Sequence, residues 1–159
     1  MGKIMEQRIE TDKYFMEIAT TVAKRSTCLR RSVGCVLVDS KNHIVATGYN
    51  GVPKGFEHCL DSPCEGGFAV SGTDLDLCNA IHAEVNAFLQ LRSDDKLTAY
   101  VTTTPCFSCA KMIANTNVER IVAKERYAHR QALIVLGEAG IQVEVLDIDK
   151  ELIGVLNYE

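Results

Sequence analysis

Two short motifs constrain this chain more than any other feature, because together they carry the ligands of a metal ion. The first is His82-Ala83-Glu84, near the predicted start of a helix, and the second is Pro105-Cys106-Phe107-Ser108-Cys109, which precedes another predicted helix. Imidazole nitrogen and thiolate sulfur are ligands that zinc prefers, and three such ligands leave one tetrahedral position for water. The fold must therefore bring two distant helix starts to one point.

The spacing within each motif restricts where the metal can lie. Cys106 and Cys109 are three residues apart, so they share one face of a helix, whose first turn favours thiolate over thiol. His82 and Glu84 are two residues apart, which is roughly 200° around an ideal helix. Both can approach one metal only at the mouth of their helix, toward which side chains lean.

A proton carrier completes this ligand set. Two thiolates and a neutral imidazole already cancel the charge of Zn²⁺, so the metal should polarise its water less than a three-histidine site does. Glu84 is the candidate to take a proton from that water and deliver it to a substrate ring nitrogen, and then to protonate departing ammonia. A thioredoxin-like redox pair and a purely structural zinc knuckle are alternative interpretations of the cysteines, but neither needs Glu84.

Hydrophobic periodicity predicts alternating helices and strands along the chain. Helices are expected over 12–24, 81–91, 105–115, 130–139 and 150–156, and strands over 33–38, 44–49, 97–102, 118–123 and 141–146. Helices that cross over between strands imply one sheet covered on both faces, and the length suits a single domain, 1–159. Cys35, among apolar neighbours in its strand, is an expected core thiol.

Local details of three helices are also predicted. Thr11 or Asp12 caps the first helix, and Thr104 caps the third, with Pro105 in its first turn. In the helix over 81–91, the expected buried stripe consists of Val85, Phe88 and Leu89.

The stretch over 50–78 interrupts this pattern. It is rich in glycine and proline, has no apolar periodicity and carries Cys59, Cys64 and Cys78. A loop of this length within a compact domain is normally functional, disordered or tied down. Since the core pattern resumes directly afterwards, we expect an insertion and not a linker.

Charge and hydropathy argue against several classes of function. The net charge of −4 and the absence of a basic, aromatic-rich stretch argue against nucleic acid as a partner. No apolar run approaches the length of a membrane span, and the N-terminus has no signal-peptide core, so a cytoplasmic protein is expected. In that compartment seven cysteines indicate metal ligands or buried thiols, not disulfides.

The two motifs resemble those of the cytidine deaminase superfamily. The stretches Arg25-Ser26-Thr27-Cys28 and Gly48-Tyr49-Asn50-Gly51, the pair His58-Cys59 and Cys78 resemble its deoxycytidylate (dCMP) deaminase branch. The resemblance implies a three-layer α/β/α sandwich with a central mixed five-stranded sheet. It also implies zinc-dependent hydrolysis of dCMP to dUMP and ammonia, which feeds dTMP synthesis. The implied zinc ligands are His82, Cys106 and Cys109, and the implied catalytic residue is Glu84.

The same resemblance implies residues that hold the substrate. Asn50 would hold the sugar, Ala83 would contact the substrate, and Tyr127 would lie near the phosphate. Arg25 is the first candidate for binding the phosphate and Arg30 is the second. A turn residue, a half-buried aromatic and a solvated basic loop are the competing interpretations of Asn50, Tyr127 and Arg25.

Four further cysteines are candidates for a second, structural zinc site: Cys28, Cys59, Cys64 and Cys78. Such a site would tie the insertion to the first helix, since metal binding contributes folding free energy. His58 could replace Cys64, and independent buried thiols are the alternative.

Members of this branch are commonly homohexamers, activated by dCTP and inhibited by dTTP with Mg²⁺. The resemblance therefore implies a homohexamer with an effector site near Gly51, Gly55 and Phe56. Glycine there could let backbone amides approach a phosphate, or it could simply shape turns.

Two other functions fit the metal motifs. A tRNA adenosine-type or other polynucleotide deaminase shares both motifs, although the acidic balance argues against it. A catalytically silent zinc-binding module would keep the ligands, but it would have no use for Glu84.

Overall fold

A mixed sheet forms the middle of the protein, whose computed structural model describes residues 8–70, 73–126, 129–146 and 154–155. Its strands are β1 (Gly34–Asp39), β2 (Ile44–Tyr49), β3 (Leu97–Thr103), β4 (Val118–Glu125), β5 (Gln142–Val145) and β6 (Gly154–Val155). The strand order is β2-β1-β3-β4-β5-β6. β1 is antiparallel to β2 and β3, the pairs β3–β4 and β4–β5 are parallel, and β6 is antiparallel to β5.

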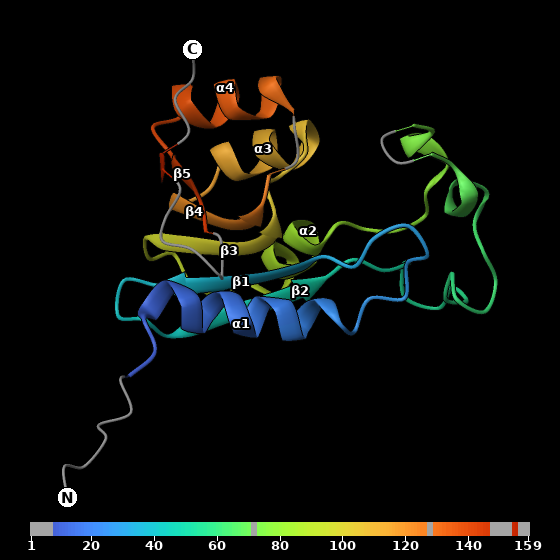
Figure 1. Ribbon diagram of the computed structural model, residues 1–159, viewed down its shortest axis with the longest axis horizontal. Helices are drawn as coiled ribbons and strands as arrows, with labels where there is room; N and C mark the ends of the chain where they lie inside the picture. The colour runs from blue at the N-terminus through green and yellow to red at the C-terminus, as the bar shows by residue number, and fades with distance from the viewer. Residues whose placement is uncertain (1–7, 71–72, 127–128, 147–153, 156–159) are drawn as a thin grey trace, which may run out of the picture.

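Helices cover both faces of this sheet (Figure 1): α1 (Thr11–Ala23), α2 (Ala83–Gln90), α3 (Phe107–Ala114) and α4 (Arg130–Glu138). α1 packs on one face, in an apolar cluster that includes Phe15 and Met16. The other three helices pack on the opposite face, in a cluster that includes Ala87 and Ile113. The predicted three-layer sandwich is therefore confirmed. No helix in the described ranges is long and apolar enough to cross a bilayer.

The sheet has one strand more than the five predicted. The five expected strands lie within two residues of their predicted bounds, but Gly154 and Val155 form a sixth, paired with Val145 and Glu144. The helix predicted over 150–156 is therefore wrong at 154–155, and the rest of that stretch lies outside the described residues. Pairing with β5 satisfies backbone groups that an open sheet edge would leave to solvent.

The predicted side-chain cap of α1 is wrong. The helix begins at Thr11, with Glu10 at the N-cap and no side-chain cap bond. Asp12 instead accepts hydrogen bonds from Arg120 of β4, at 2.6 and 2.9 Å, and from the hydroxyl of Tyr100. A charge-assisted pair with two parallel bonds is stronger than a neutral cap bond, so this carboxylate fastens α1 to the sheet.

The packing of α2 depends on a glycine beneath it. The predicted buried stripe is wrong at Val85, which is partly exposed and outside the core cluster, and at Leu89, which is 64% exposed; Phe88 is partly buried against the core. The buried residues of the helix are Ala83, Glu84 and Ala87. A Cβ on Gly48 of β2 would lie 2.2 Å from the carbonyl oxygen of Ala83. Helix and strand therefore approach so closely that large side chains cannot face the sheet there.

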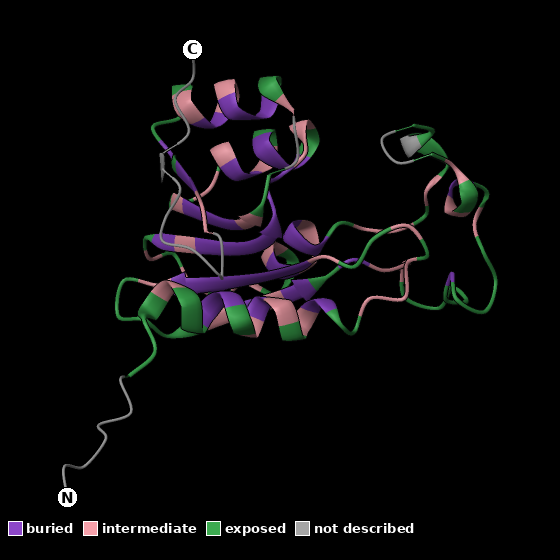
Figure 2. Cartoon of the chain, in the orientation of Figure 1, coloured by how far each residue is buried: buried purple, intermediate pink, exposed green. Residues whose placement is uncertain are grey.

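The predicted insertion leaves the sheet as an arm, which we define as residues 52–80 (Figure 1). Hydrogen bonds between the backbones of Gly51 and Ile81, at 2.8 and 3.1 Å, close its base. Its described residues include two short 3₁₀ helices, η1 (Glu65–Phe68) and η2 (Leu75–Leu77), and most are exposed or partly exposed (Figure 2). Because the arm has little regular secondary structure, side-chain contacts are needed to stabilise its backbone conformation.

Candidate metal centre and active site

The two metal motifs meet where α2 and α3 begin. His82 is the N-cap residue of α2 and has extended backbone angles (φ −67°, ψ 152°). Because His82 lies outside the regular helix, the ideal helical angle between its side chain and that of Glu84 does not apply. Cys106 is the N-cap residue of α3, and its sulfur accepts a hydrogen bond from the backbone N of Cys109. The predicted cap by Thr104 and first-turn place of Pro105 are wrong, because α3 begins at Phe107.

The three predicted ligand atoms lie within one coordination sphere. Nδ1 of His82 is 3.5 Å from Sγ of Cys106 and 3.4 Å from Sγ of Cys109. All three atoms lie within 4.8 Å of one another. With zinc–nitrogen and zinc–sulfur bonds of normal length, tetrahedral geometry separates such ligand atoms by about 3.5 Å. The donor set and its spacing therefore fit a zinc ion.

The two sulfurs differ in their affinity for a proton. Hydrogen bonding with Cys109 lowers the pKa of Cys106 to about 3; burial opposes this, and His82 reinforces it. The same contact, together with burial, raises the pKa of Cys109. The hydrogen bond to Cys106 also raises the pKa of His82. The set thus already stabilises a thiolate, the form of cysteine that binds metals.

Glu84 lies beside this set, in the first turn of α2, and is only 4% exposed. Burial raises the pKa of its carboxyl group, against smaller lowering effects that include His82 and a hydrogen bond with Cys109. A carboxyl group with a raised pKa can hold and release a proton closer to neutral pH, as a general acid–base group must.

A cavity opens next to these residues. Its volume of about 130 Å³ is well above the roughly 30 Å³ of one water molecule. The loop between α1 and β1, the end of β2, the base of the arm and the end of β3 all contribute to its wall. Besides His82, Glu84 and Cys106, its lining includes Arg30, Arg31, Asn50 and Ala83.

Two of the predicted substrate residues, Asn50 and Ala83, line this cavity. Asn50 is 6% exposed, and its Oδ1 accepts a hydrogen bond from the backbone N of Val33 at 2.8 Å. Its Nδ2 donates to the carbonyl oxygen of Arg31 at 2.8 Å. Asn50 therefore also fastens the loop after α1 to the end of β2. Tyr127 lies outside the described residues.

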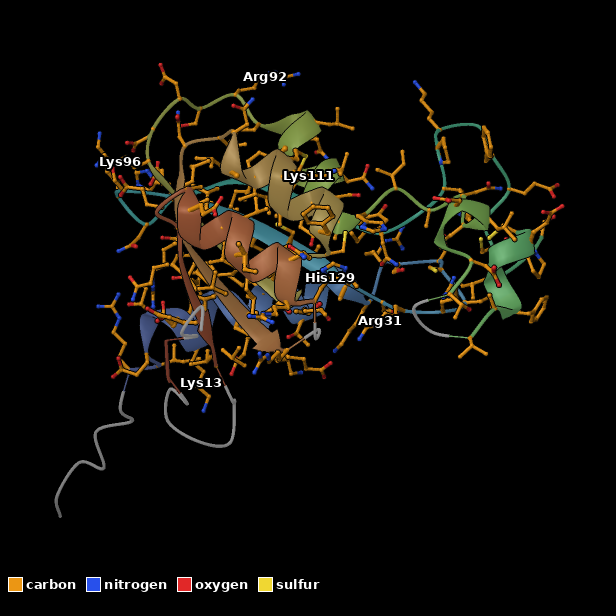
Figure 3. The ribbon with its side chains drawn as sticks, turned by 90° about the horizontal axis from the view of Figure 1, so that it is seen from above. Lys13, Arg31, Arg92, Lys96, Lys111 and His129 are labelled. Atoms are coloured by element: carbon orange, nitrogen blue, oxygen red, sulfur yellow. The ribbon has the colours of Figure 1, made fainter. Side chains whose placement is uncertain are left out.

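The positions of the arginines differ from the predicted order. Arg25, the first candidate, is exposed just after α1 and is not in the cavity lining, whereas Arg30 and Arg31 line it. Arg31 lies between the body of the sheet and the arm (Figure 3). Sequence reasoning missed Arg31, because nothing in the basic loop indicates which of its arginines lies beside the cavity. The bond from Asn50 Nδ2 to the carbonyl oxygen of Arg31 fixes the backbone at this point.

The four remaining candidate ligands gather where the arm meets the loop after α1. Burial raises the pKa values of Cys59 and Cys78, and the neighbouring Cys64 and Cys28 raise them further. No three of these sulfurs match the 4.8 Å spacing of the first metal set. Nδ1 of His58 is instead 3.0 Å from the hydroxyl of Thr27. The arrangement favours Cys64 over His58 as a member of the cluster.

The predicted effector residues lie at the base of the arm, outside the cavity lining. Gly51 pairs with Ile81, as described above. Gly55 has a positive φ of 89°, which glycine adopts without strain, and Phe56 is 57% exposed. Turn geometry is a sufficient reason for glycine at position 55.

Sequence comparisons match this site to known proteins. A family model described as the cytidine and deoxycytidylate deaminase zinc-binding region matches residues 9–125. A deoxycytidylate deaminase of Schizosaccharomyces pombe is 39% identical over 140 residues, which cover 83% of this chain and 42% of that protein. This chain thus spans less than half the length of that relative. A deoxycytidylate deaminase of Mycobacterium phage D29 is 40% identical over 122 residues, covering 72% of this chain and 94% of the phage protein.

A solved structure has the same fold over most of the chain. It is the dCMP deaminase of cyanophage S-TIM5 in complex with dCMP and dUMP, with a TM-score of 0.72 and 28% sequence identity. The match covers 89% of this chain and 100% of the phage chain.

Proposed function

Because this chain belongs to the cytidine and deoxycytidylate deaminase family, we propose that it catalyses the zinc-dependent hydrolysis of dCMP to dUMP and ammonia. The observation that carries the proposal is the position of Glu84, which is buried against a His–Cys–Cys set at the wall of one cavity. A structural zinc site has no use for a buried carboxyl group at that place. The product dUMP would serve as a precursor of dTMP.

The ligands in this proposal are His82, Cys106 and Cys109, and the acid–base group is Glu84. Bound zinc supplies a polarised water at neutral pH. Glu84 takes a proton as the new C–O bond forms at C4 of the base, and gives it to the adjacent ring nitrogen. It then takes the proton of the new hydroxyl group at C4 and passes it to the amino group, as the C–N bond breaks and the C4 carbonyl group forms. One water is consumed and one ammonia leaves, so the atoms balance.

The remaining cavity residues would hold the nucleotide. Asn50 and Ala83 would contact the sugar and base, and Arg30 and Arg31 would bind the phosphate. A guanidinium group suits phosphate in both charge and hydrogen-bond geometry. Arg25 becomes the weaker candidate, since it lies outside the cavity.

Turnover monitored by ultraviolet absorption on dCMP, CMP, deoxycytidine and a single-stranded oligonucleotide tests the proposal. We expect turnover of dCMP to exceed that of deoxycytidine and of the oligonucleotide, since the cavity offers two arginines to one small anion. A rate on dCMP well above the rate on CMP would support the deoxynucleotide as substrate. Turnover confined to the oligonucleotide would keep the deamination chemistry but overturn the substrate. A zinc-loaded protein with no activity on any of the four would favour a silent zinc-binding module.

We also propose a second, structural zinc ion on Cys28, Cys59, Cys64 and Cys78. The mutual contacts of these thiols support it, as does the position of the cluster between the arm and the loop after α1. Metal binding there would contribute folding free energy to an arm that has little regular structure.

Regulation and assembly complete the proposal. dCTP as activator and dTTP as inhibitor, each with Mg²⁺, would bind near Gly51, Gly55 and Phe56, in a cytoplasmic homohexamer. Initial rates with and without each effector test the regulation, and a mass measured in solution tests the hexamer. An initial rate that neither nucleotide changes would contradict the proposed effector site. A solution mass equal to that of one chain would contradict the proposed hexamer.

A further inference from the structure

Arg30 contacts the arm and the cavity at the same time. Its Nη2 donates hydrogen bonds to the carbonyl oxygens of Val70 at 2.9 Å and Thr73 at 3.0 Å. Both acceptors belong to the arm, 40 and 43 residues further along the chain. Arg30 also lines the cavity that holds Glu84. A single guanidinium group therefore joins the arm to the wall of the candidate active site.

Thr73 holds the two carbonyl groups in place relative to each other. Its hydroxyl donates a hydrogen bond to the carbonyl oxygen of Val70 at 2.7 Å, and its backbone N–H donates to the same oxygen at 3.0 Å. The oxygen that receives Arg30 is thus positioned by Thr73, and the second acceptor is the carbonyl of Thr73 itself. The direction of Nη2 of Arg30 therefore depends on the conformation of Thr73.

The opposite end of the guanidinium group has no partner on the described chain. Nη1 of Arg30 is buried without a hydrogen bond, and no carboxylate among the described residues forms a salt bridge with Arg30. A buried donor without an acceptor costs free energy. Because the guanidinium group is planar and rigid, the bonds at Nη2 also set the direction of Nη1. Arg30 also lines the cavity, so its positive charge lies beside the space in which an anion would bind.

We propose that Thr73 is a positioning residue for recognition of the substrate phosphate, acting through Arg30. This inference rests on the proposed function and extends it to a residue outside the cavity lining. On this account the arm is part of the substrate specificity: it orients the cation that distinguishes a nucleotide from a nucleoside. If the hydroxyl of Thr73 is removed, the guanidinium group of Arg30 is held less firmly in its orientation. Phosphate binding then weakens, while the chemistry at the base stays unchanged.

Kinetics of two Thr73 variants test this role. Thr73→Val removes the hydroxyl and keeps the shape, and we expect KM for dCMP to rise about tenfold, the loss typical of one hydrogen bond in a charged network. The kcat for dCMP and the kcat/KM for deoxycytidine should stay unchanged. Thr73→Ser keeps a hydroxyl and should restore the preference for dCMP. Equal losses for dCMP and deoxycytidine, or no loss for either, would overturn the inference.

A matched control is available at Thr116. Its hydroxyl also donates to a carbonyl three residues back, that of Ile113, at 2.6 Å, and it does not line the cavity. Thr116→Val should leave KM for dCMP unchanged. A rise as large as that of Thr73→Val would mean that loss of any such bond weakens the enzyme, and the inference would fail.

A binding measurement separates this inference from the proposed function. Thermal unfolding of the zinc-loaded chain is followed in rising concentrations of inorganic phosphate and of dUMP, neither of which requires turnover. Both should raise Tm for the natural protein and for Thr73→Ser, and much less for Thr73→Val. Equal responses in all three would overturn the inference even if dCMP is deaminated. A lost response in Thr73→Val without any dCMP turnover would support the inference while the proposed function fails.

Discussion

Gly48 of β2 lies directly beneath Ala87 of α2, so closely that a Cβ on Gly48 would be 2.4 Å from the backbone N of Ala87. The first turn of the same helix carries Glu84, and His82 caps it. This contact between glycine and helix backbone therefore sets the height of the metal centre above the sheet.

Replacing that glycine should lower the stability of the protein. We expect Gly48→Ala to lower the free energy of unfolding by about 1–3 kcal/mol, the usual range for overpacking, because the Cβ meets helix backbone and not a flexible side chain. Chemical denaturation measures the change. Gly67→Ala is the control, since its Cβ would have no neighbour nearer than 3.5 Å. Equal stability of the two variants would contradict the account of α2.

Glu84→Gln should keep the metal and lose turnover. The amide cannot carry protons, so we expect kcat to fall by about 10²–10⁴, the typical contribution of general acid–base catalysis. Zinc content by elemental analysis should match that of the natural protein. Glu119→Gln, in an exposed pair with Lys96, serves as the control and should behave normally. Near-normal turnover by Glu84→Gln would contradict the proposed role of Glu84 as the acid–base group.

Cys28→Ser should reduce bound zinc from two ions toward one per chain. The loss of one ligand should also loosen the arm, which limited proteolysis at the exposed Phe68 would report. Cys35→Ala is the matched control, because Cys35 is a fully buried thiol in β1 that belongs to the apolar core. Unchanged stoichiometry in Cys28→Ser would mean that the four cysteines are simple thiols.

The two arginine candidates can be separated by truncation. We expect Arg30→Ala to raise KM for dCMP about 10–100-fold, the loss expected for a charge-assisted contact to phosphate, with little effect on deoxycytidine. Arg25→Ala should change neither, since Arg25 lies outside the cavity lining. The reverse pattern would restore Arg25 as the residue that binds the phosphate.

The pair between Asp12 and Arg120 should make stability depend on pH in the acid range. Hydrogen bonding to Arg120 holds the pKa of Asp12 below its ordinary value of 3.8, against the effect of burial. A lowered folded-state pKa gives stability that is present above the unfolded pKa and is lost as pH falls through the folded one. Asp12→Asn should therefore be less stable at pH 7, and the difference should shrink below about pH 4. A difference that is independent of pH would rule out this linkage.

Patterns within single segments predicted most of the fold. Short apolar segments located five strands, because a strand covered on both faces, as β1 is, buries nearly every side chain. The helix boundaries were less certain: the pattern alone could not indicate that Asp12 would bind Arg120, more than a hundred residues away, instead of capping α1. The short strand β6 was missed for the same reason, since it exists through its pairing with β5.

Residue types and their spacing in the sequence predict the chemistry of the site. His82, Glu84, Cys106 and Cys109 have ligand and acid–base groups that specify a metal centre, because donor type and local spacing are properties of the residues themselves. Which neighbours face that centre became known from the folded structure alone. Arg30 enters the cavity and Arg25 does not, because a loop's path depends on contacts with distant segments, here the amide of Asn50 and the carbonyls of the arm. Contacts of this kind produce no periodic pattern in the sequence from which they could be predicted.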